Sequence, residues 1–275
     1  MREIVVPSFV SMSQPVAETL EQLAGVGVRL VELLADAPDR HIDLADDAAV
    51  RALAEAVRGL PLAVYSVHGG FSHPSEDAWD ISQPDPVARA AALRRQAQVV
   101  RASALLGAHH VVVHPGVRHR GEDRLRHSRD SLAELAEVAR EAGTVVAVEN
   151  LPPNHLCESL AETQRVLDGL DPAVVGFCLD TGHAMMGEDT IGDYIHALSD
   201  RMVGIHWHAS DHAHDAHLFP DVEHGEWDEL FAALDEVGYS RPVTVEAVPP
   251  ATTPLEEAVR SVRAALQGER APHAA

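Results

Sequence analysis

The sequence predicts a single (β/α)8 barrel, and three observations support this fold class. Short apolar, β-branched segments alternate with longer amphipathic segments along the chain. Apolar strands that alternate with helices are typical of a parallel sheet covered by helices. Eight such units in 275 residues fit a closed barrel better than an open doubly wound sheet, for which a GxGxxG motif after the first strand is also missing.

The expected elements follow from this alternation. Helical segments such as DSLAELAEVAREAG and EWDELFAALDEVG carry an apolar face, and several close with a glycine, which tolerates the left-handed conformation. These glycines are Gly25, Gly107, Gly143 and Gly238. We expect the strands at residues 3–6, 28–33, 62–67, 110–113, 144–148, 174–179, 202–206 and 242–245.

No internal linker and no low-complexity segment is apparent, so we expect one domain. We place the barrel at residues 1–268 and a loose C-terminal tail at residues 269–275. Two cysteines are too few for a disulfide framework, and neither a signal peptide nor a membrane-spanning apolar run is apparent. These features predict a cytoplasmic protein without a membrane segment.

The charged residues exclude several classes of chemistry. The formal net charge is −22, and all 21 basic residues are arginines, so the chain contains no lysine. Schiff-base aldolase chemistry, pyridoxal phosphate and a lysine general base are therefore excluded. The negative charge opposes binding to a nucleic acid duplex, and we expect a small-molecule substrate instead. The sequence leaves a homo-oligomer open.

Polar residues stand at the C-terminal ends of the expected strands. Chemistry in barrels of this class is located at these ends. Seven consecutive strands, from the second to the eighth, carry a carboxylate or an imidazole there. These residues are Glu32, His68, His114, Glu149, Asp180 with His183, His206 with His208, and Glu246.

Three of these carboxylates predict a metal centre. Glu149, Asp180 and Glu246 would repel one another in one barrel mouth and raise each other's pKa. A bound divalent cation removes that cost and accounts for the nearby histidines. The alternative for a single histidine is a buried, hydrogen-bonded side chain, and for a single carboxylate it is an ion pair. Carboxylate-rich coordination suits Mn²⁺ or Mg²⁺, whereas added imidazoles suit Zn²⁺.

Other polar residues are candidates for binding substrate or more metal. His206 and His208 share a face of a regular strand, so one can bind metal while the other contacts substrate or packs. The following segment, DHAHDAHLFPDVEHGEWDEL, is rich in Asp and His, with a solvated polar loop as its alternative.

Arginines after the fourth strand are candidates for holding a substrate anion. These are Arg118 and Arg120, and their alternative is a solvated helix start. The segment VTVEAVPP lacks the glycine-rich backbone of the common barrel phosphate site, which favours an unphosphorylated substrate. The expected substrate-binding residues are thus Glu32, His208 and Arg118.

The strand-end motifs VHGG, VVVHPG, VENLP, LDTGHA and IHWH, with a later Asp-x-His and a final glutamate, resemble as a set those of the xylose isomerase-like barrels. That superfamily includes endonuclease IV, D-tagatose 3-epimerase, hydroxypyruvate isomerase and inosose dehydratase, and the likeness covers nearly the whole chain. Its sugar epimerases imply one metal held by Glu149, Asp180, His206 and Glu246, with Glu149 and Glu246 as the catalytic pair that moves the proton. The endonuclease IV pattern implies three zinc ions, with the additional ligands His68, His114, His183, Asp215 and His217.

Departures from the nuclease pattern favour a small-molecule enzyme. The nuclease has a cysteine where DTGHAMMGED has its first glycine, and His-Leu-Asn-Asp where this chain has HWHASDH. No wedge of Arg, Tyr and Leu for penetrating DNA is apparent. We therefore expect an isomerase or epimerase of a sugar or related hydroxy-carbonyl compound that acts through an enediolate. The alternatives are a dehydratase with the same residues, a trinuclear zinc phosphodiesterase and a non-catalytic sugar-binding barrel.

Overall fold

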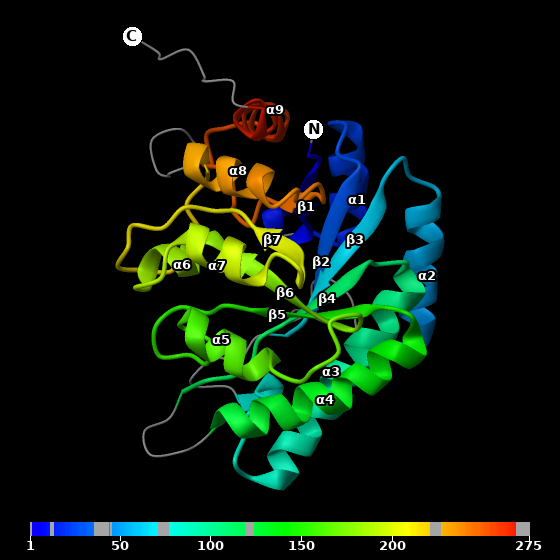
Figure 1. Ribbon diagram of the computed structural model, residues 1–275. Coiled ribbons are helices and arrows are strands. Elements are labelled where there is room, and N and C mark those ends of the chain that lie inside the picture. The colour runs from blue at the N-terminus through cyan, green and yellow to red at the C-terminus, as the bar shows by residue number, and fades with distance from the viewer. Residues whose placement is uncertain are drawn as a thin grey trace.

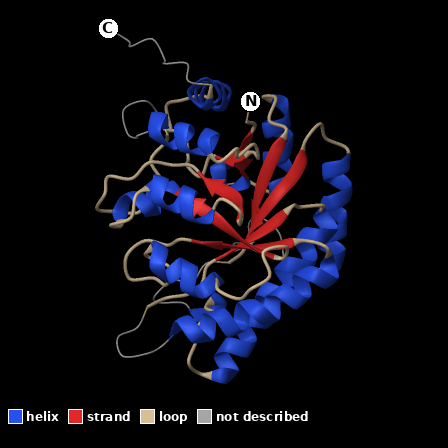
Figure 2. Ribbon diagram, in the orientation of Figure 1, coloured by secondary structure: helices blue, strands red, loops and turns tan. Residues whose placement is uncertain are grey.

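The computed structural model describes residues 2–11, 14–35, 44, 46–70, 77–118, 124–220 and 227–267. Within these residues, eight parallel strands are hydrogen-bonded in chain order from β1 to β8, and β8 pairs with β1 to close a barrel. Helices lie outside the strands in Figures 1 and 2. The predicted (β/α)8 fold is confirmed, and the predicted C-terminal tail lies outside the described residues.

The strands are β1 (Ile4–Pro7), β2 (Leu30–Leu34), β3 (Ala63–His68), β4 (His110–Val113), β5 (Val145–Glu149), β6 (Val175–Asp180), β7 (Met202–His206) and β8 (Val243–Thr244). The helices are α1 (Val16–Gly25), α2 (Asp47–Arg58), α3 (Pro86–Leu106), α4 (Arg124–Ala142), α5 (Leu160–Leu167), α6 (Thr181–Met186), α7 (Ile191–Leu198), α8 (Trp227–Glu236) and α9 (Leu255–Leu266). Short 3-10 helices are η1 (Ser8–Ser11) and η2 (Asp77–Trp79).

Most strands extend further toward their C-terminal ends than predicted. β4 and β7 have the predicted bounds, whereas β5 and β6 include the polar residues that we placed just after them. The reason is that these residues still pair with the neighbouring strand, Glu149 with Cys178 and Asp180 with His206. The polar side chains at these positions are therefore held by the regular sheet.

A left-handed glycine directly follows α3, whereas after α1 the left-handed glycine lies two residues beyond the last helical residue. Gly107 follows α3 in the left-handed conformation, with φ of 76°. In α1, Gly25 is the last helical residue, and the left-handed position falls on Gly27, with φ of 78°. The helix therefore ends at Gly25 as predicted, but in the sequence GVG the second glycine adopts the left-handed conformation.

Two irregularities in the sheet decide which residues share a layer of the barrel. Val31 of β2 pairs with Val64 of β3, but the next pair is Glu32 with Ser66, so the pairing skips Tyr65. A second shift occurs between β6 and β7. Because His68 ends β3 two residues after Ser66, Glu32 lies one layer below the rim of the barrel.

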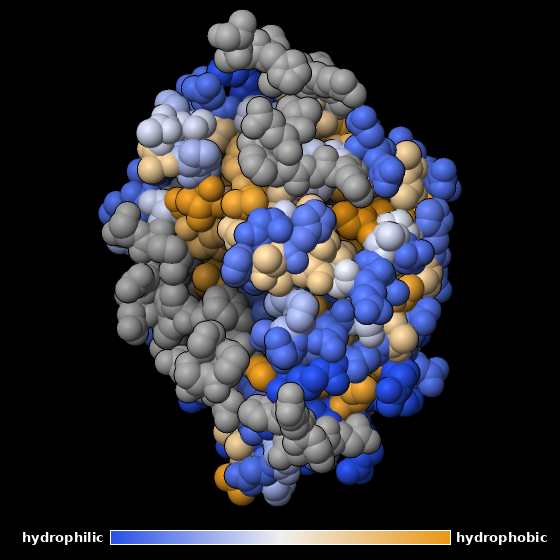
Figure 3. Space-filling view, turned by 90° about the vertical axis from the view of Figure 1, so that its left-hand side faces the viewer, coloured by the Kyte–Doolittle hydropathy of each residue, from blue (hydrophilic) through white to orange (hydrophobic). Residues whose placement is uncertain are grey.

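On the face shown in Figure 3, hydrophilic residues predominate and hydrophobic residues form small, separate groups. No helix among the described residues has the length and hydropathy needed to cross a membrane. Cys157 and Cys178 are both buried and unbridged.

Candidate metal centre

The ends of β5 to β8 bring together the four residues of the single-metal pattern, here called the central cluster. Glu149, Asp180 and His206 are the last residues of β5, β6 and β7, and Glu246 follows β8 by two residues. One ligand atom of each lies within 4.8 Å of those of the other three. All four residues are buried, with at most 5% of their surface exposed. Adjacent parallel strands end at one rim, so four separate segments deliver donors to one place.

Nδ1 of His206 lies at the middle of the central cluster. It is 2.8 Å from Oε1 of Glu149, 3.0 Å from Oε2 of Glu246 and 3.9 Å from Oδ2 of Asp180. A single nitrogen carries at most one hydrogen and cannot satisfy three carboxylates. A divalent cation held by the same residues would compensate these charges.

A second group, the His68 cluster, shares Glu149 with the central cluster. Nε2 of His114 lies 3.0 Å from Oε2 of Glu149, and Nε2 of His68 lies 3.5 Å from the same oxygen. His68 ends β3 and His114 follows β4, so this cluster continues the rim beyond β5. One ligand atom of each of these three residues lies within 4.8 Å of those of the other two, as in the central cluster.

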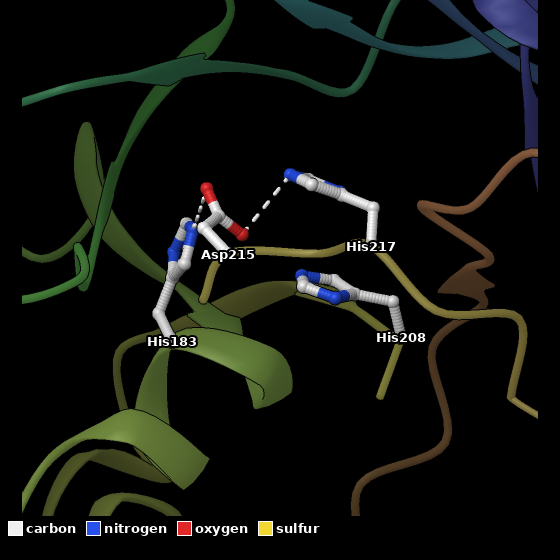
Figure 4. A group of neighbouring side chains, drawn as sticks. All are labelled: His183, His208, Asp215 and His217. Atoms are coloured by element: carbon white, nitrogen blue, oxygen red, sulfur yellow. Dashed lines mark ion pairs between the residues drawn. The ribbon is translucent and has the colours of Figure 1, made fainter. Parts of the chain in front are cut away.

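The third group, the outer cluster, consists of His183, His208, Asp215 and His217. In Figure 4 the Asp215 carboxylate lies between His183 and His217, and its oxygens are 3.3 Å and 3.2 Å from their Nε2 atoms. The ring of His208 stacks on that of His217, with centroids 4.2 Å apart. The three clusters together contain all nine residues of the three-zinc pattern, and His208 in addition.

Four of the histidines point Nδ1 at a backbone carbonyl oxygen. The pairs are His68 with Gly69 (2.7 Å), His183 with Asn150 (2.9 Å), His208 with Ala209 (3.2 Å) and His217 with Glu246 (2.9 Å). Because a carbonyl oxygen only accepts, each Nδ1 carries the hydrogen, and in a neutral ring the lone pair lies on Nε2. Metal-binding histidines have this arrangement, in which the second nitrogen donates to a fixed acceptor.

Several buried ligand atoms lack a hydrogen bond. Oε2 of Glu149, Oε2 of Glu246 and Nε2 of His183 have no hydrogen-bond partner among the described residues, although polar atoms lie nearby. Buried polar atoms are normally satisfied, so such atoms require an explanation. A bound cation supplies one, and the donor set of this chain therefore fits a metal.

The electrostatics of the outer cluster also favour a cation. Burial alone lowers the pKa of His183, but the negative charges of Asp180 and Asp215 raise it to about 9. Burial likewise lowers the pKa of His217, but its hydrogen bond with Asp215 and the charge of Glu246 raise it to about 10. The carboxylates thus stabilise positive charge here, whether a proton or a metal ion supplies it.

Asn150 is a site residue that the sequence reasoning missed. Its side-chain amide donates to the carbonyl oxygen of Asp180 (2.9 Å), and its side-chain oxygen accepts from the Asp180 N–H (2.8 Å). Its own carbonyl oxygen accepts from Nδ1 of His183 (2.9 Å). The sequence could have indicated this residue, because Asn150 directly follows the predicted ligand Glu149 in VENLP. Asp180 is further fixed because its Oδ1 caps α6 by accepting from the His183 N–H (2.7 Å).

Of the three predicted substrate-binding residues, Glu32 lies below the rim and Arg118 is held in ion pairs. Glu32 is the third residue of β2, 1% exposed, inside the barrel. Arg118 forms ion pairs with Glu162 and Glu158, so it is bound to α5 and its flanking loop. His208 is in the outer cluster. Arg120 lies outside the described residues.

Solved structures with the same fold cover almost the whole chain. A D-tagatose 3-epimerase-like protein matches with a TM-score of 0.82 and 19% identity over 97% of this chain and 96% of its own. The 3-keto-D-glucoside 4-epimerase from E. coli matches with a TM-score of 0.78 and 21% identity over 98% and 100%. The IolI protein with a bound zinc atom matches with a TM-score of 0.79 and 18% identity over 96% and 95%. At these identities the likeness concerns the fold.

A family model adds evidence from the sequence itself. Residues 20–266 match the model described as the xylose isomerase-like TIM barrel. The matched range runs from within α1 to the end of α9. This range includes every strand that contributes to the three clusters. The chain therefore belongs to the xylose isomerase-like TIM barrel family.

Proposed function

We propose that this chain is a divalent-metal-dependent isomerase or epimerase of a sugar or a related hydroxy-carbonyl compound. The observation that carries the proposal is the central cluster, in which three carboxylates and Nδ1 of His206 converge in a buried site. Two of the similar solved structures are named as sugar epimerases or epimerase-like proteins, which supports the same class of substrate.

In this proposal the residues of the central cluster bind the metal and transfer the proton. A bound divalent metal would polarise a substrate carbonyl and a neighbouring hydroxyl, and so acidify the C–H bond between them. Glu149 and Glu246 would remove and return that proton. Oε2 of each accepts no hydrogen bond within the described chain and is available for this role. Asp180 and His206 would hold the metal together with the two glutamates.

The environment of Arg118 supports an unphosphorylated substrate. Its guanidinium lies 3.3 Å from Oε1 of Glu158 and also pairs with Glu162. Two carboxylates already compensate its charge, so an anionic substrate group would have to displace them. The neutral hydroxyl groups of a free sugar face no such competition.

A trinuclear zinc phosphodiesterase is the second candidate, and the His68 and outer clusters favour it. One feature of the outer cluster argues against it. His208 is a fourth candidate donor beside His183, Asp215 and His217, and its Nε2 also lies 2.9 Å from Oδ2 of Asp180. Zinc sites with four protein ligands are closed and structural, whereas hydrolytic sites keep a position for water. We therefore propose that a metal in the outer cluster would be structural.

Solvent deuterium labelling tests the isomerase against the hydrolase. The purified, metal-loaded protein is incubated with a panel of ketoses and hydroxy-pyruvate-like compounds in deuterated water, and products are read by NMR and mass spectrometry. Enediolate chemistry places deuterium on the carbon next to the carbonyl, because a proton held by Glu149 or Glu246 exchanges with solvent. A dehydratase would instead yield a product lighter by one water.

Two variants and one competing assay complete the test. Glu246→Gln should lose turnover, whereas Glu236→Gln, an exposed glutamate on α8, should keep it. Turnover without label, or release of phosphate from a phosphodiester in the place of sugar turnover, contradicts the proposal. Metal analysis of the protein purified without added ions gives the number of bound ions per chain.

A further inference from the structure

His206 is oriented differently from the other histidines of the site. His68, His183, His208 and His217 all point Nδ1 at a backbone carbonyl oxygen, which leaves Nε2 as the inward atom. In His206 it is Nδ1 that faces the carboxylates of the central cluster. Its hydrogen must therefore lie on Nε2 if Nδ1 is to offer a lone pair to a metal.

The partner of Nε2 is Glu32, a buried carboxylate that the proposed reaction does not use. Nε2 of His206 lies 3.3 Å from Oε2 of Glu32, across the barrel from β7 to β2. Ser66 Oγ donates to the same oxygen at 2.6 Å. The shift in pairing between β2 and β3 places Ser66 directly beside Glu32. A dedicated pocket thus holds this carboxylate one layer below the rim.

Glu32 is not a well-satisfied core residue. It is 1% exposed, and Oε1 has no hydrogen-bond partner among the described residues. A buried carboxylate with an unsatisfied oxygen costs stability, and an apolar side chain of similar size would avoid that cost. Its presence therefore indicates a role other than packing.

We propose that Glu32 is a positioning residue that accepts the Nε2–H of His206 and so fixes the tautomer whose Nδ1 lone pair binds the metal. The carboxylate also increases the basicity of the imidazole as a ligand. This inference rests on the proposed metal-dependent function, and it replaces the substrate contact expected from the sequence. Substrate contact is disfavoured because Oε2 is taken by Ser66 and His206 and the residue lies below the metal ligands.

The test compares metal affinity with the stability of the metal-free protein. Glu32→Leu removes the acceptor, Glu32→Gln keeps an acceptor oxygen without the charge, and Glu55→Gln on α2 is an exposed control. The affinity for Zn²⁺ and Mn²⁺ is measured by chelator competition, at a temperature at which every metal-free variant is folded. The melting temperature of each metal-free protein is measured in parallel.

We expect Glu32→Leu to weaken metal binding about 10- to 100-fold, as for other carboxylates hydrogen-bonded to a ligand histidine. Glu32→Gln should regain part of this loss, and Glu55→Gln should match the wild type. A merely structural role predicts a lower melting temperature with unchanged affinity. Unchanged affinity in Glu32→Leu overturns the inference, and if that variant does not fold, unchanged affinity in Glu32→Gln does so.

His206→Ala separates failure of this inference from failure of the proposed function. If the wild type binds a metal ion that His206→Ala loses, and both Glu32 variants bind that ion with wild-type affinity, only the role of Glu32 is wrong. If His206→Ala binds metal as tightly as the wild type, the central cluster is not the metal site and the proposed function fails with it.

Discussion

Gly182 lies against the imidazole ring of His208, and only glycine leaves room for that ring. A Cβ atom at residue 182 would be 2.0 Å from Cε1 and 2.4 Å from Nδ1 of His208. Both residues stand at positions at which this chain departs from the endonuclease IV pattern, Gly182 in LDTGHA and His208 in IHWH. The departures therefore form one structural unit, in which a glycine on α6 creates the space that a histidine after β7 fills.

Gly182→Ala should destabilise the protein. Overpacking typically costs about 1–3 kcal/mol, which outweighs the gain of up to about 1 kcal/mol from replacing a helical glycine by alanine. Gly187→Ala is the matched control, because its Cβ would meet no atom closer than 3.5 Å. The double variant Gly182→Ala/His208→Ala should recover stability, since the clash is gone. Chemical denaturation measures each free energy of unfolding, and equal values for Gly182→Ala and Gly187→Ala would contradict the clash.

Removing ligands of the central cluster should abolish activity and metal binding. Asp180→Asn and His206→Ala each remove a donor, so both should lower the bound metal measured by elemental analysis. Glu149→Gln and Glu246→Gln should abolish turnover because they remove the proton-transferring carboxylates. Asp47→Asn, an exposed residue of α2, serves as the control. Full occupancy and full activity in both Asp180→Asn and His206→Ala would show that the metal is held elsewhere.

Breaking the buried ion pair of Asp80 and Arg124 should strongly destabilise the barrel. Nη1 of Arg124 lies 2.7 Å from Oδ2 of Asp80, and their side chains are 5% and 0% exposed. Asp80→Ala would leave the guanidinium without this buried partner, at a cost of about 3–5 kcal/mol. Glu55→Ala removes an exposed ion pair with Arg58 and should cost at most about 1 kcal/mol. Urea unfolding of the two variants provides the comparison, and similar losses would refute the distinction.

The protein should not bind DNA at physiological salt. A net charge of −22 without lysine opposes the phosphate contacts on which duplex binding depends. Fluorescence anisotropy with a labelled duplex that carries an abasic site measures the interaction. A salt-dependent dissociation constant below the micromolar range, with cleavage of the strand, would favour the phosphodiesterase.

The sequence alone determined the fold class and the residue types at the rim. Apolar runs of strand length alternate with amphipathic helices, and this pattern has few compact solutions other than the closed barrel. A residue at the end of a parallel strand faces the same rim whatever the details of packing. Glu149, Asp180, His206 and Glu246 could therefore be named from their positions in the sequence.

Only the tertiary structure decided how these residues are grouped and which atoms they present. The contact between Glu32 and His206 joins β2 to β7 across the barrel and depends on a skipped residue between β2 and β3. The outer cluster depends on an irregular loop after β7, in which His217 has a positive φ of 42°. Local patterns fix the face of a strand on which a side chain lies. Registers between strands, loop conformations and the proton-bearing nitrogen of a histidine are set by contacts distant in the chain, and the sequence does not display them.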